Sequence, residues 1–101
     1  MKKTTLADAA RVPFDLEGYI MHASAKVEVI HLCLQPGQVV AKHSNPFDVV
    51  VCLVKGEVRL SVGESDIAMA VYDVAEVEAF TERGFTNSSP SEARLIVIKK
   101  L

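Results

Sequence analysis

The amino-acid sequence predicts an all-β fold. Short segments rich in valine, isoleucine and leucine recur about every eight to twelve residues, and glycine, proline, asparagine or serine separates them. Several of these segments alternate apolar and polar residues, which is the period of a strand with one buried face. No segment joins a helical period to the length that a packed amphipathic helix needs. This combination is typical of a β-sandwich or β-barrel.

The first elements follow from local sequence. Residues 5–10 are expected to form one helical turn with a threonine at its cap. Residues 26–34 are rich in β-branched side chains and predict a strand, which ends at the Gln35-Pro36-Gly37 turn. A second strand is predicted at residues 39–42, before a break at Ser44-Asn45-Pro46.

The second half of the chain continues the series. A strand is predicted at residues 48–54, where a continuous apolar run follows Asp48, and Lys55-Gly56 is expected to make a tight hairpin into residues 57–62. In that following strand the apolar residues lie at every second position, so they share one face. The remaining strands are predicted at residues 67–71, 74–77, 84–86 and 93–98.

Composition limits the classes of protein. The chain has 101 residues, 50% of them hydrophobic and 24% charged, which predicts one folded domain over residues 1–101 and excludes disorder. The formal net charge is −2, and no basic run exceeds two residues, so we expect no nucleic-acid partner. No apolar window reaches the roughly 18 residues of a membrane span. Asp8 and Arg11 interrupt the only segment that resembles a signal peptide, and we expect a cytoplasmic protein with no membrane partner.

The two cysteines carry no motif. Cys33 and Cys52 each lie inside an apolar run, and no Cys-x-x-Cys spacing is present. Such residues are expected to be buried free thiols that pack as small hydrophobic side chains. The sequence therefore indicates neither a zinc site nor a redox pair.

The segment from Gly37 to Gly56 resembles the first motif of the cupin family, Gly-x5-His-x-His-x3-Glu-x6-Gly. Both glycines and His43 stand at the offsets of that motif. Asn45 stands at the second histidine position, and Val49 stands at the glutamate position.

The second cupin motif, Gly-x5-Pro-x-Gly-x2-His-x3-Asn, is matched only at its last residue, Asn87. Tyr72, Glu78, Phe80 and Arg83 replace the leading glycine, the proline, the second glycine and the histidine. In strand order the resemblance covers roughly residues 26–101. It implies a cupin-type jelly-roll β-barrel, in which two sheets form a sandwich around a ligand-sized cavity, and it implies a homodimer.

The resemblance implies a metal position that this chain has lost. In the family, three histidines and a glutamate hold a divalent metal ion, and His43 is the only imidazole left at those positions. The Asn45 carbonyl is a poor ligand for a transition metal, Val49 offers no donor, and the Arg83 guanidinium repels a cation. We therefore expect no metal and no cofactor. The alternative is weak metal binding by His43 together with Asp48, His22 or His31.

Arg83 needs a partner if it points into the barrel, because a buried unpaired charge is costly. The favoured interpretation is an internal acid, and the candidates are Glu28, Asp48, Glu76 and Glu78. The alternative is an anionic ligand that Arg83 holds bidentately, with His43 and Asn45 as neutral hydrogen-bond partners. A third interpretation is that Arg83 leaves the barrel at its mouth.

Three classes of function follow. The leading one is a small-molecule binding protein without a metal, whose ligand is a small carboxylate or similar anion. Its predicted ligand-binding residues are His43, Asn45, Val49, Arg83 and Phe85. The second is an enzyme, either a metal-dependent dioxygenase or isomerase or a metal-free isomerase, with His43 as the acid or base. The third is a structural or interaction module that dimerises through an apolar sheet face.

Overall fold

The computed structural model describes residues 1–101 and contains ten strands and no helix. The structure therefore contains no helix that could span a membrane. The strands are β1 (Ala10–Arg11), β2 (Glu17–Ala23), β3 (Val27–Leu34), β4 (Val39–His43), β5 (Asp48–Lys55), β6 (Val58–Val62), β7 (Ser65–Met69), β8 (Val74–Val77), β9 (Arg83–Thr86) and β10 (Ala93–Lys100).

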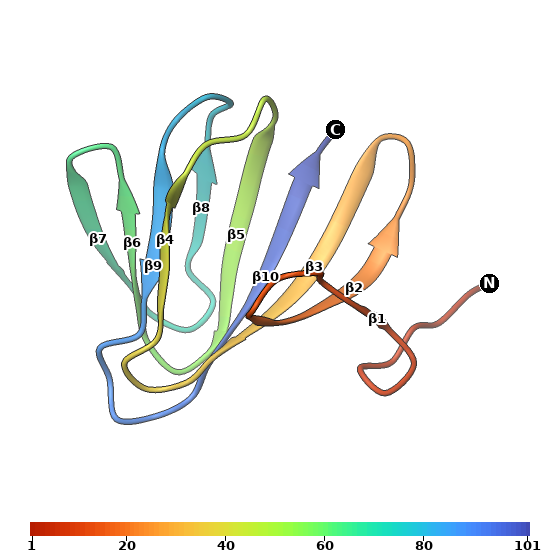
Figure 1. Cartoon of the computed structure of the whole chain (residues 1–101), viewed down its shortest axis with the longest axis horizontal. Coiled ribbons are helices and arrows are strands. Elements are labelled where there is room, and N and C mark those ends of the chain that lie inside the picture. The colour runs from red at the N-terminus through yellow and green to blue at the C-terminus, as the bar shows by residue number, and fades with distance from the viewer.

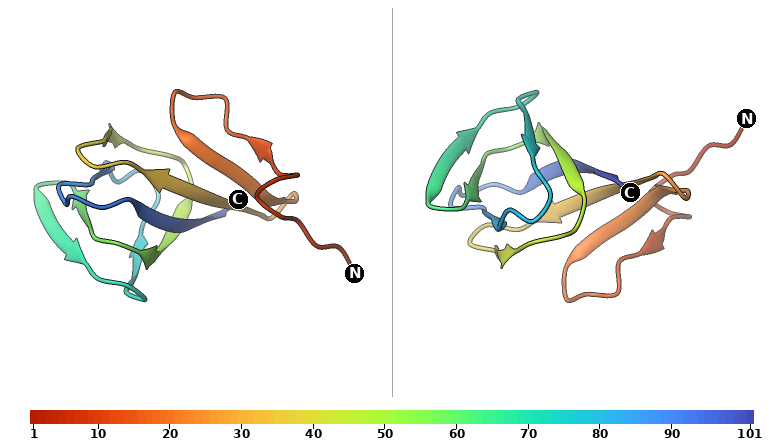
Figure 2. Two further views of the ribbon diagram at one scale, coloured as in Figure 1. Left: turned by 90° about the horizontal axis from the view of Figure 1, so that it is seen from below. Right: turned by 90° about the horizontal axis from the view of Figure 1, so that it is seen from above.

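Two antiparallel sheets face each other (Figure 1). The six-stranded sheet has the order β1-β2-β3-β10-β5-β8, and the four-stranded sheet has the order β4-β9-β6-β7. The views from above and below show the two sheets closing around a common interior, with the β1–β2 hairpin extending to one side (Figure 2). The predicted all-β fold is confirmed.

The eight strands expected from the sequence correspond to β3 through β10, with ends displaced by a few residues. The prediction was wrong before residue 26, where it had no strand. β2 is rich in neither valine nor isoleucine, and pairing with β3 defines it: Tyr19 lies opposite His31, and Ile20 opposite Ile30. β1 in turn pairs only with β2.

The N-terminal turn forms as a single capped turn. The amide of Ala9 donates to the carbonyl of Thr5 at 3.0 Å. The Thr5 amide donates to Asp8 Oδ1 at 2.8 Å, and the Asp8 amide donates to Thr5 Oγ1 at 3.3 Å. This reciprocal pair is a capping box. The turn ends where β1 begins at Ala10, so it does not continue into a helix.

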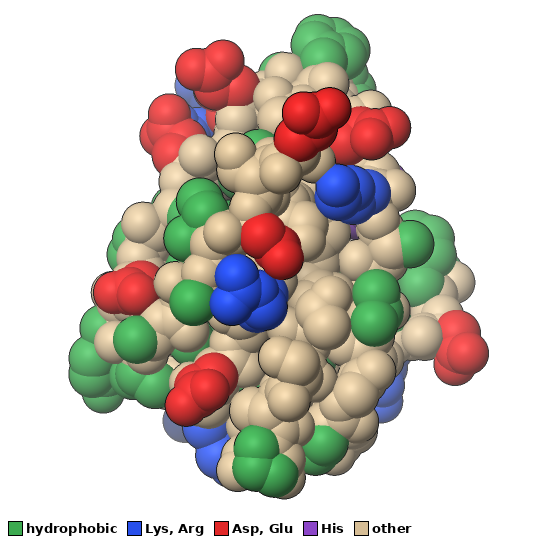
Figure 3. All heavy atoms as spheres, turned by 90° about the vertical axis from the view of Figure 1, so that its left-hand side faces the viewer, with side chains coloured by type: hydrophobic (Ala, Val, Ile, Leu, Met, Phe, Trp, Pro, Cys, Tyr) green, Lys and Arg blue, Asp and Glu red, His purple; other side chains and the backbone are tan.

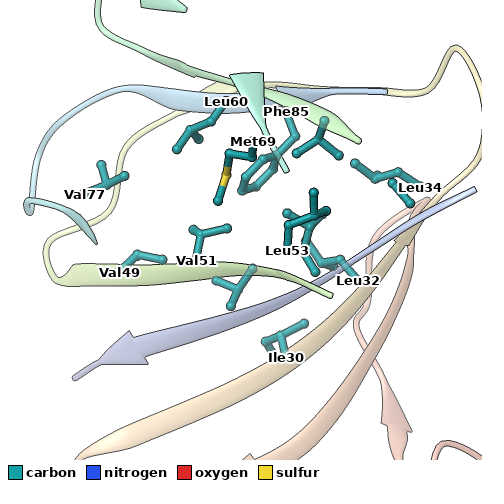
Figure 4. Packing of buried hydrophobic residues seen from close by; sticks show 14 residues of the cluster. Ile30, Leu32, Leu34, Val49, Val51, Leu53, Leu60, Met69, Val77 and Phe85 are labelled. Carbon is teal, nitrogen blue, oxygen red and sulfur yellow. The ribbon is translucent and has the colours of Figure 1, made fainter. Parts of the chain in front are cut away.

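A cluster of 14 buried hydrophobic side chains fills the space between the sheets (Figure 4). Its members alternate along the strands: in β5, Val49, Val51 and Leu53 are buried, whereas their neighbours are only partly buried or exposed. One subset of this cluster also borders the pocket described below. Those shared residues are Ile30, Leu32, Val49, Phe85 and Val97.

Asn87 connects the end of β3 with the loop between β9 and β10. Its side chain is fully buried, and Nδ2 donates to the carbonyl oxygens of Leu34 at 3.0 Å and Ser91 at 2.8 Å. Oδ1 accepts from the hydroxyl of Ser89 at 2.7 Å. Asn87 therefore stabilises the loop between β9 and β10 through hydrogen bonds to the backbone.

Charged side chains of both signs are scattered over the side of the molecule that carries β7 (Figure 3). Basic and acidic side chains lie next to each other there, as in the ion pair between Arg59 and Asp66 at 3.3 Å. This face therefore offers no continuous basic surface of the kind that binds a nucleic-acid backbone.

Candidate functional site

A pocket of about 500 Å³ opens between the two sheets. Both sheets and the segment between β1 and β2 contribute to its wall, and ten of the 16 lining residues are hydrophobic. The lining residues are Val12, Phe14, Asp15, Leu16, Ile30, Leu32, Gln38, Val39, Val40, His43, Asn45, Val49, Arg83, Phe85, Val97 and Lys99.

All five site residues predicted from the sequence lie in this one wall: His43, Asn45, Val49, Arg83 and Phe85. Val49 and Phe85 point inward because they occupy buried positions of β5 and β9. The other three bring their polar groups together at the end of the barrel where β4 ends and β9 begins (Figure 1).

Arg83 is the first residue of β9 and is only 4% exposed, although it carries a guanidinium. With the Asn45 amide oriented so that its oxygen faces Arg83, that oxygen accepts from Nη2 at 2.5 Å and from Nη1 at 3.3 Å. The Asn45 nitrogen then donates to the Ser44 carbonyl at 3.1 Å. Burial lowers the pKa of Arg83 from its ordinary value. A neutral amide therefore holds a buried cation.

No carboxylate pairs with Arg83, since none of the five ion pairs in the structure includes it. The expected internal acid partner is therefore wrong. Two of the acids considered as partners form ion pairs with lysines: Glu28 with Lys99 at 3.1 Å and Glu76 with Lys100 at 3.6 Å. Asp48 Oδ1 accepts a hydrogen bond from the Ala79 amide at 2.8 Å. Glu78 forms no ion pair. The interpretation that Arg83 leaves the barrel at its mouth is also wrong, because the side chain is buried.

His43 lies beside Arg83, as its partner in the β4–β9 ladder. Its Nδ1 lies 3.1 Å from the Ala41 carbonyl. A carbonyl oxygen only accepts hydrogen bonds, so Nδ1 is the donor in this contact, and in the neutral imidazole Nε2 then holds the lone pair. Nε2 has no hydrogen-bond partner within the chain, and the side chain is exposed at the pocket.

Gly84 permits the close approach of β4 to β9 next to this group. A Cβ at Gly84 would lie 2.5 Å from the Val40 carbonyl oxygen and 3.0 Å from the Lys42 nitrogen. The register between the two strands shifts at this point, between Val40 and His43. From its sequence context, Gly84 is expected only to form part of a strand. A glycine inside a strand is itself a signal of close backbone approach or of a bulge.

The segment between β1 and β2 was not expected at the site. Val12, Phe14, Asp15 and Leu16 all line the pocket. Gly18 lets this segment pack closely, because a Cβ there would lie 2.7 Å from a Val12 methyl group. Nothing in the local sequence of this segment indicates that it reaches the barrel.

A second polar cluster lies around Cys33 and Glu92. The Cys33 thiol donates to Glu92 Oε1 at 3.0 Å, and burial together with this bond raises its pKa to about 11. Hydrogen bonds from Cys33, Arg94 and Lys55 lower the pKa of Glu92 to about 2. Cys33 is therefore a protonated, buried thiol at neutral pH and not a nucleophile. Both cysteines are free, as expected, but only Cys33 is buried, and Cys52 is partly exposed.

The match to a known family extends over most of the chain: residues 30–99 match the Cupin domain family. The chain belongs to the cupin superfamily. No curated protein matches the sequence.

Solved structures share the fold over almost the whole chain. A crystal structure of TT1209 from Thermus thermophilus is 28% identical, with a TM-score of 0.84, and the match covers 99% of this chain and 97% of that one. An uncharacterized conserved protein with a double-stranded beta-helix domain from Klebsiella pneumoniae is 16% identical, with a TM-score of 0.85 and coverage of 99% and 90%. A predicted oxalate decarboxylase from Thermotoga maritima is 13% identical, with a TM-score of 0.88 and coverage of 100% and 99%. At 13% and 16% identity the likeness shows the cupin double-stranded β-helix and nothing about activity.

The cupin metal position can be tested against the side chains present here. No group of three or more histidine, cysteine, aspartate or glutamate side chains is placed to hold a metal ion. At the positions matching the family's ligands, His43 supplies one imidazole, the Asn45 oxygen faces a guanidinium, and Val49 supplies no donor. The further candidates from the sequence do not line the pocket: Asp48, His22 and His31. These residues do not fit a transition-metal ion.

The two glycine positions of the second cupin motif are occupied by aromatic residues with a positive φ. Tyr72 and Phe80, which stand at the two glycine positions, are the only non-glycine residues with a positive φ, at 74° and 65°. This left-handed region is costly for a residue with a Cβ and is free for glycine. The chain therefore carries strained aromatic residues in the turns before and after β8.

Substituting either residue by glycine is expected to stabilise the protein by about 0.5–1 kcal/mol, because relief of the backbone strain exceeds the added entropy of the unfolded chain. Little packing is lost, since Tyr72 is 79% and Phe80 75% exposed. Urea denaturation of Tyr72→Gly and Phe80→Gly measures the change. Phe14→Gly is the control: Phe14 is 72% exposed, its φ is not positive, and its substitution is expected to destabilise. If both variants lose as much free energy of unfolding as the Phe14→Gly control, the backbone at Tyr72 and Phe80 is not strained.

Proposed function

We propose that this cupin binds a small molecule through a carboxylate or a similar singly charged oxyanion, with Arg83 as the anchor and without a metal ion. One observation carries the proposal: Arg83 is buried, borders the pocket, and has a neutral amide as its partner instead of an acid. A buried cation without a counter-charge is unfavourable, and a bidentate carboxylate offers the geometry and charge that a guanidinium prefers.

The neighbouring side chains support this role in different ways. Asn45 is a positioning residue, because its oxygen is already bonded to the guanidinium and its nitrogen to Ser44. The lone pair on His43 Nε2 is available to accept a hydrogen bond from a hydroxyl of the ligand. Lys99 also borders the pocket, but Glu28 neutralises it. Arg83 is therefore the cation of the pocket wall that has no acidic partner.

Isothermal titration with benzoate and its neutral isostere benzamide tests the proposal. Hydrogen bonds to a charged group contribute about 1.5–3 kcal/mol, so benzoate is expected to bind roughly tenfold to 100-fold more tightly than benzamide. Dialysis against EDTA is expected to leave the benzoate affinity unchanged. Equal affinities for the two compounds would contradict the anionic site. Loss of binding after EDTA, with recovery on adding Mn²⁺, would contradict the metal-free site.

Three further expectations from the sequence stay predictions. They are turnover with His43 as the acid or base, a homodimer formed through an apolar sheet face, and a cytoplasmic location.

A further inference from the structure

The pocket has one polar end and a mostly apolar remainder, in which Asp15 and Gln38 are the polar residues. His43, Asn45 and Arg83 are joined by strand pairing and by hydrogen bonds at the end of β4. Lys99, near the C-terminal end of β10, also lines the pocket. The rest of the wall is mostly aliphatic and aromatic. Its apolar members are Val12, Phe14, Leu16, Ile30, Leu32, Val39, Val40, Val49, Phe85 and Val97.

The charges in the wall favour a single negative charge on the ligand. The lining contains two cations, Arg83 and Lys99, and one acid, Asp15. Glu28 pairs with Lys99 at 3.1 Å, which leaves one buried cation without a counter-charge. A second carboxylate on the ligand would lie against valine, leucine and phenylalanine side chains or near Asp15, so its desolvation would not be compensated.

The size of the pocket favours a ligand with a substantial apolar body. Its volume of about 500 Å³ lies within the range in which proteins enclose drug-sized ligands and far exceeds that of acetate or oxalate. A small dianion would leave the apolar wall in contact with water. A tail packed against that wall would gain affinity with every methylene group that it buries.

We infer that the ligand class is a monocarboxylate with an apolar tail, whose carboxylate meets Arg83 and whose tail lies along the aliphatic wall towards the segment between β1 and β2. This inference rests on the proposed function. It adds that affinity grows with the length of the tail and falls with a second charge. Phe14 is the part of that segment most suited to a test, because it borders the pocket and is 72% exposed, so that its substitution leaves the core intact.

A homologous series of ligands provides the test. Calorimetric titration with butanoate, hexanoate and octanoate is expected to show roughly threefold tighter binding per added methylene, and at least about 30-fold between the ends of the series. Succinate, which has a second carboxylate in place of the terminal methyl group of butanoate, is expected to bind at least tenfold more weakly than butanoate. Octanamide, which keeps the tail and removes the charge, is expected to bind at least tenfold more weakly than octanoate.

Two matched variants locate the tail. Phe14→Ser is expected to reduce the ratio of octanoate to butanoate affinity by threefold or more. Val74→Ser, at a residue that is 63% exposed and does not line the pocket, is expected to leave that ratio unchanged. An unchanged ratio in Phe14→Ser, or an equal fall in Val74→Ser, would overturn the placement of the tail.

The ligand series separates this inference from the proposed function. Affinities that do not rise with tail length, or succinate binding as tightly as butanoate, would overturn the inference, while a preference for octanoate over octanamide would leave the anionic site standing. Octanamide binding as tightly as octanoate would overturn the proposed function itself.

Discussion

The substitution Arg83→Met is expected to abolish carboxylate binding and, at the same time, to raise the stability of the free protein. Arg83 is 4% exposed and has no acidic partner, so its burial lowers the free energy of unfolding. Methionine keeps much of the length of the side chain and removes the charge. By analogy with buried ionic groups replaced by apolar ones, the free energy of unfolding is expected to rise by about 1–2 kcal/mol. Benzoate affinity is expected to fall at least about 100-fold.

Urea denaturation and calorimetric titration of the same variant measure the two effects. Arg59→Met is the matched control, because the Arg59 side chain is 46% exposed and its ion pair with Asp66 lies outside the pocket. That variant is expected to keep full benzoate affinity and to change stability by less than about 0.5 kcal/mol. A strongly destabilised Arg83→Met protein that still binds benzoate would refute the role assigned to Arg83.

Gly56→Ala is expected to cause a large loss of stability, about 2–5 kcal/mol. Gly56 ends the hairpin between β5 and β6 with a φ of 79°, which costs a residue with a Cβ about 1–2 kcal/mol. The added Cβ would also lie 2.5 Å from the Glu92 carbonyl oxygen and 3.0 Å from Ala93 Cα. Both are backbone atoms, so the contact cannot be relieved by a side-chain rotation, and such overpacking costs about 1–3 kcal/mol.

Gly37→Ala separates the two contributions. Gly37 has nearly the same φ, 82°, but a Cβ there would have no atom within 4 Å. Its substitution is expected to cost only the backbone contribution of about 1–2 kcal/mol. Urea denaturation of both variants gives the difference directly. Equal losses would show that β5, β6 and the loop around Glu92 are packed more loosely than the structure indicates.

Most of the barrel is predictable from the sequence because its strands carry strong local signals. β5, β6 and β10 contain dense or alternating valine, isoleucine and leucine, and Gly37, Gly56 and Gly63 mark turns that require a positive φ. β1 and β2 carry no such signal. Their backbone conformation depends on hydrogen bonds to β3, which local sequence does not encode.

The candidate site also has a part that the sequence predicts and a part that it does not. The alternation of a strand and the motif spacing suffice to bring Val49, Arg83 and Phe85 to one interior, and all three line the pocket. The partner of Arg83 could not be predicted, because it depends on which long-range pairs form. Glu28, for example, pairs with Lys99 across the β3–β10 ladder.

The segment from Val12 to Leu16 closes the pocket through tertiary packing, which depends on Gly18 fitting against Val12 and Leu32. A pattern confined to neighbouring residues does not report such a contact. The same holds for Gly84, whose role depends on the backbone of β4 lying opposite it.

The most direct test of the anionic site is a ¹H–¹⁵N spectrum of the arginine side chains during titration with benzoate. The chain has only four arginines, and the Arg83→Met variant assigns the signal of interest. The Nε–H resonance of Arg83 is expected to shift with benzoate and to stay in place with benzamide, while the other three signals move little with either compound. An Arg83 signal that does not move at benzoate concentrations that saturate the protein would contradict the account.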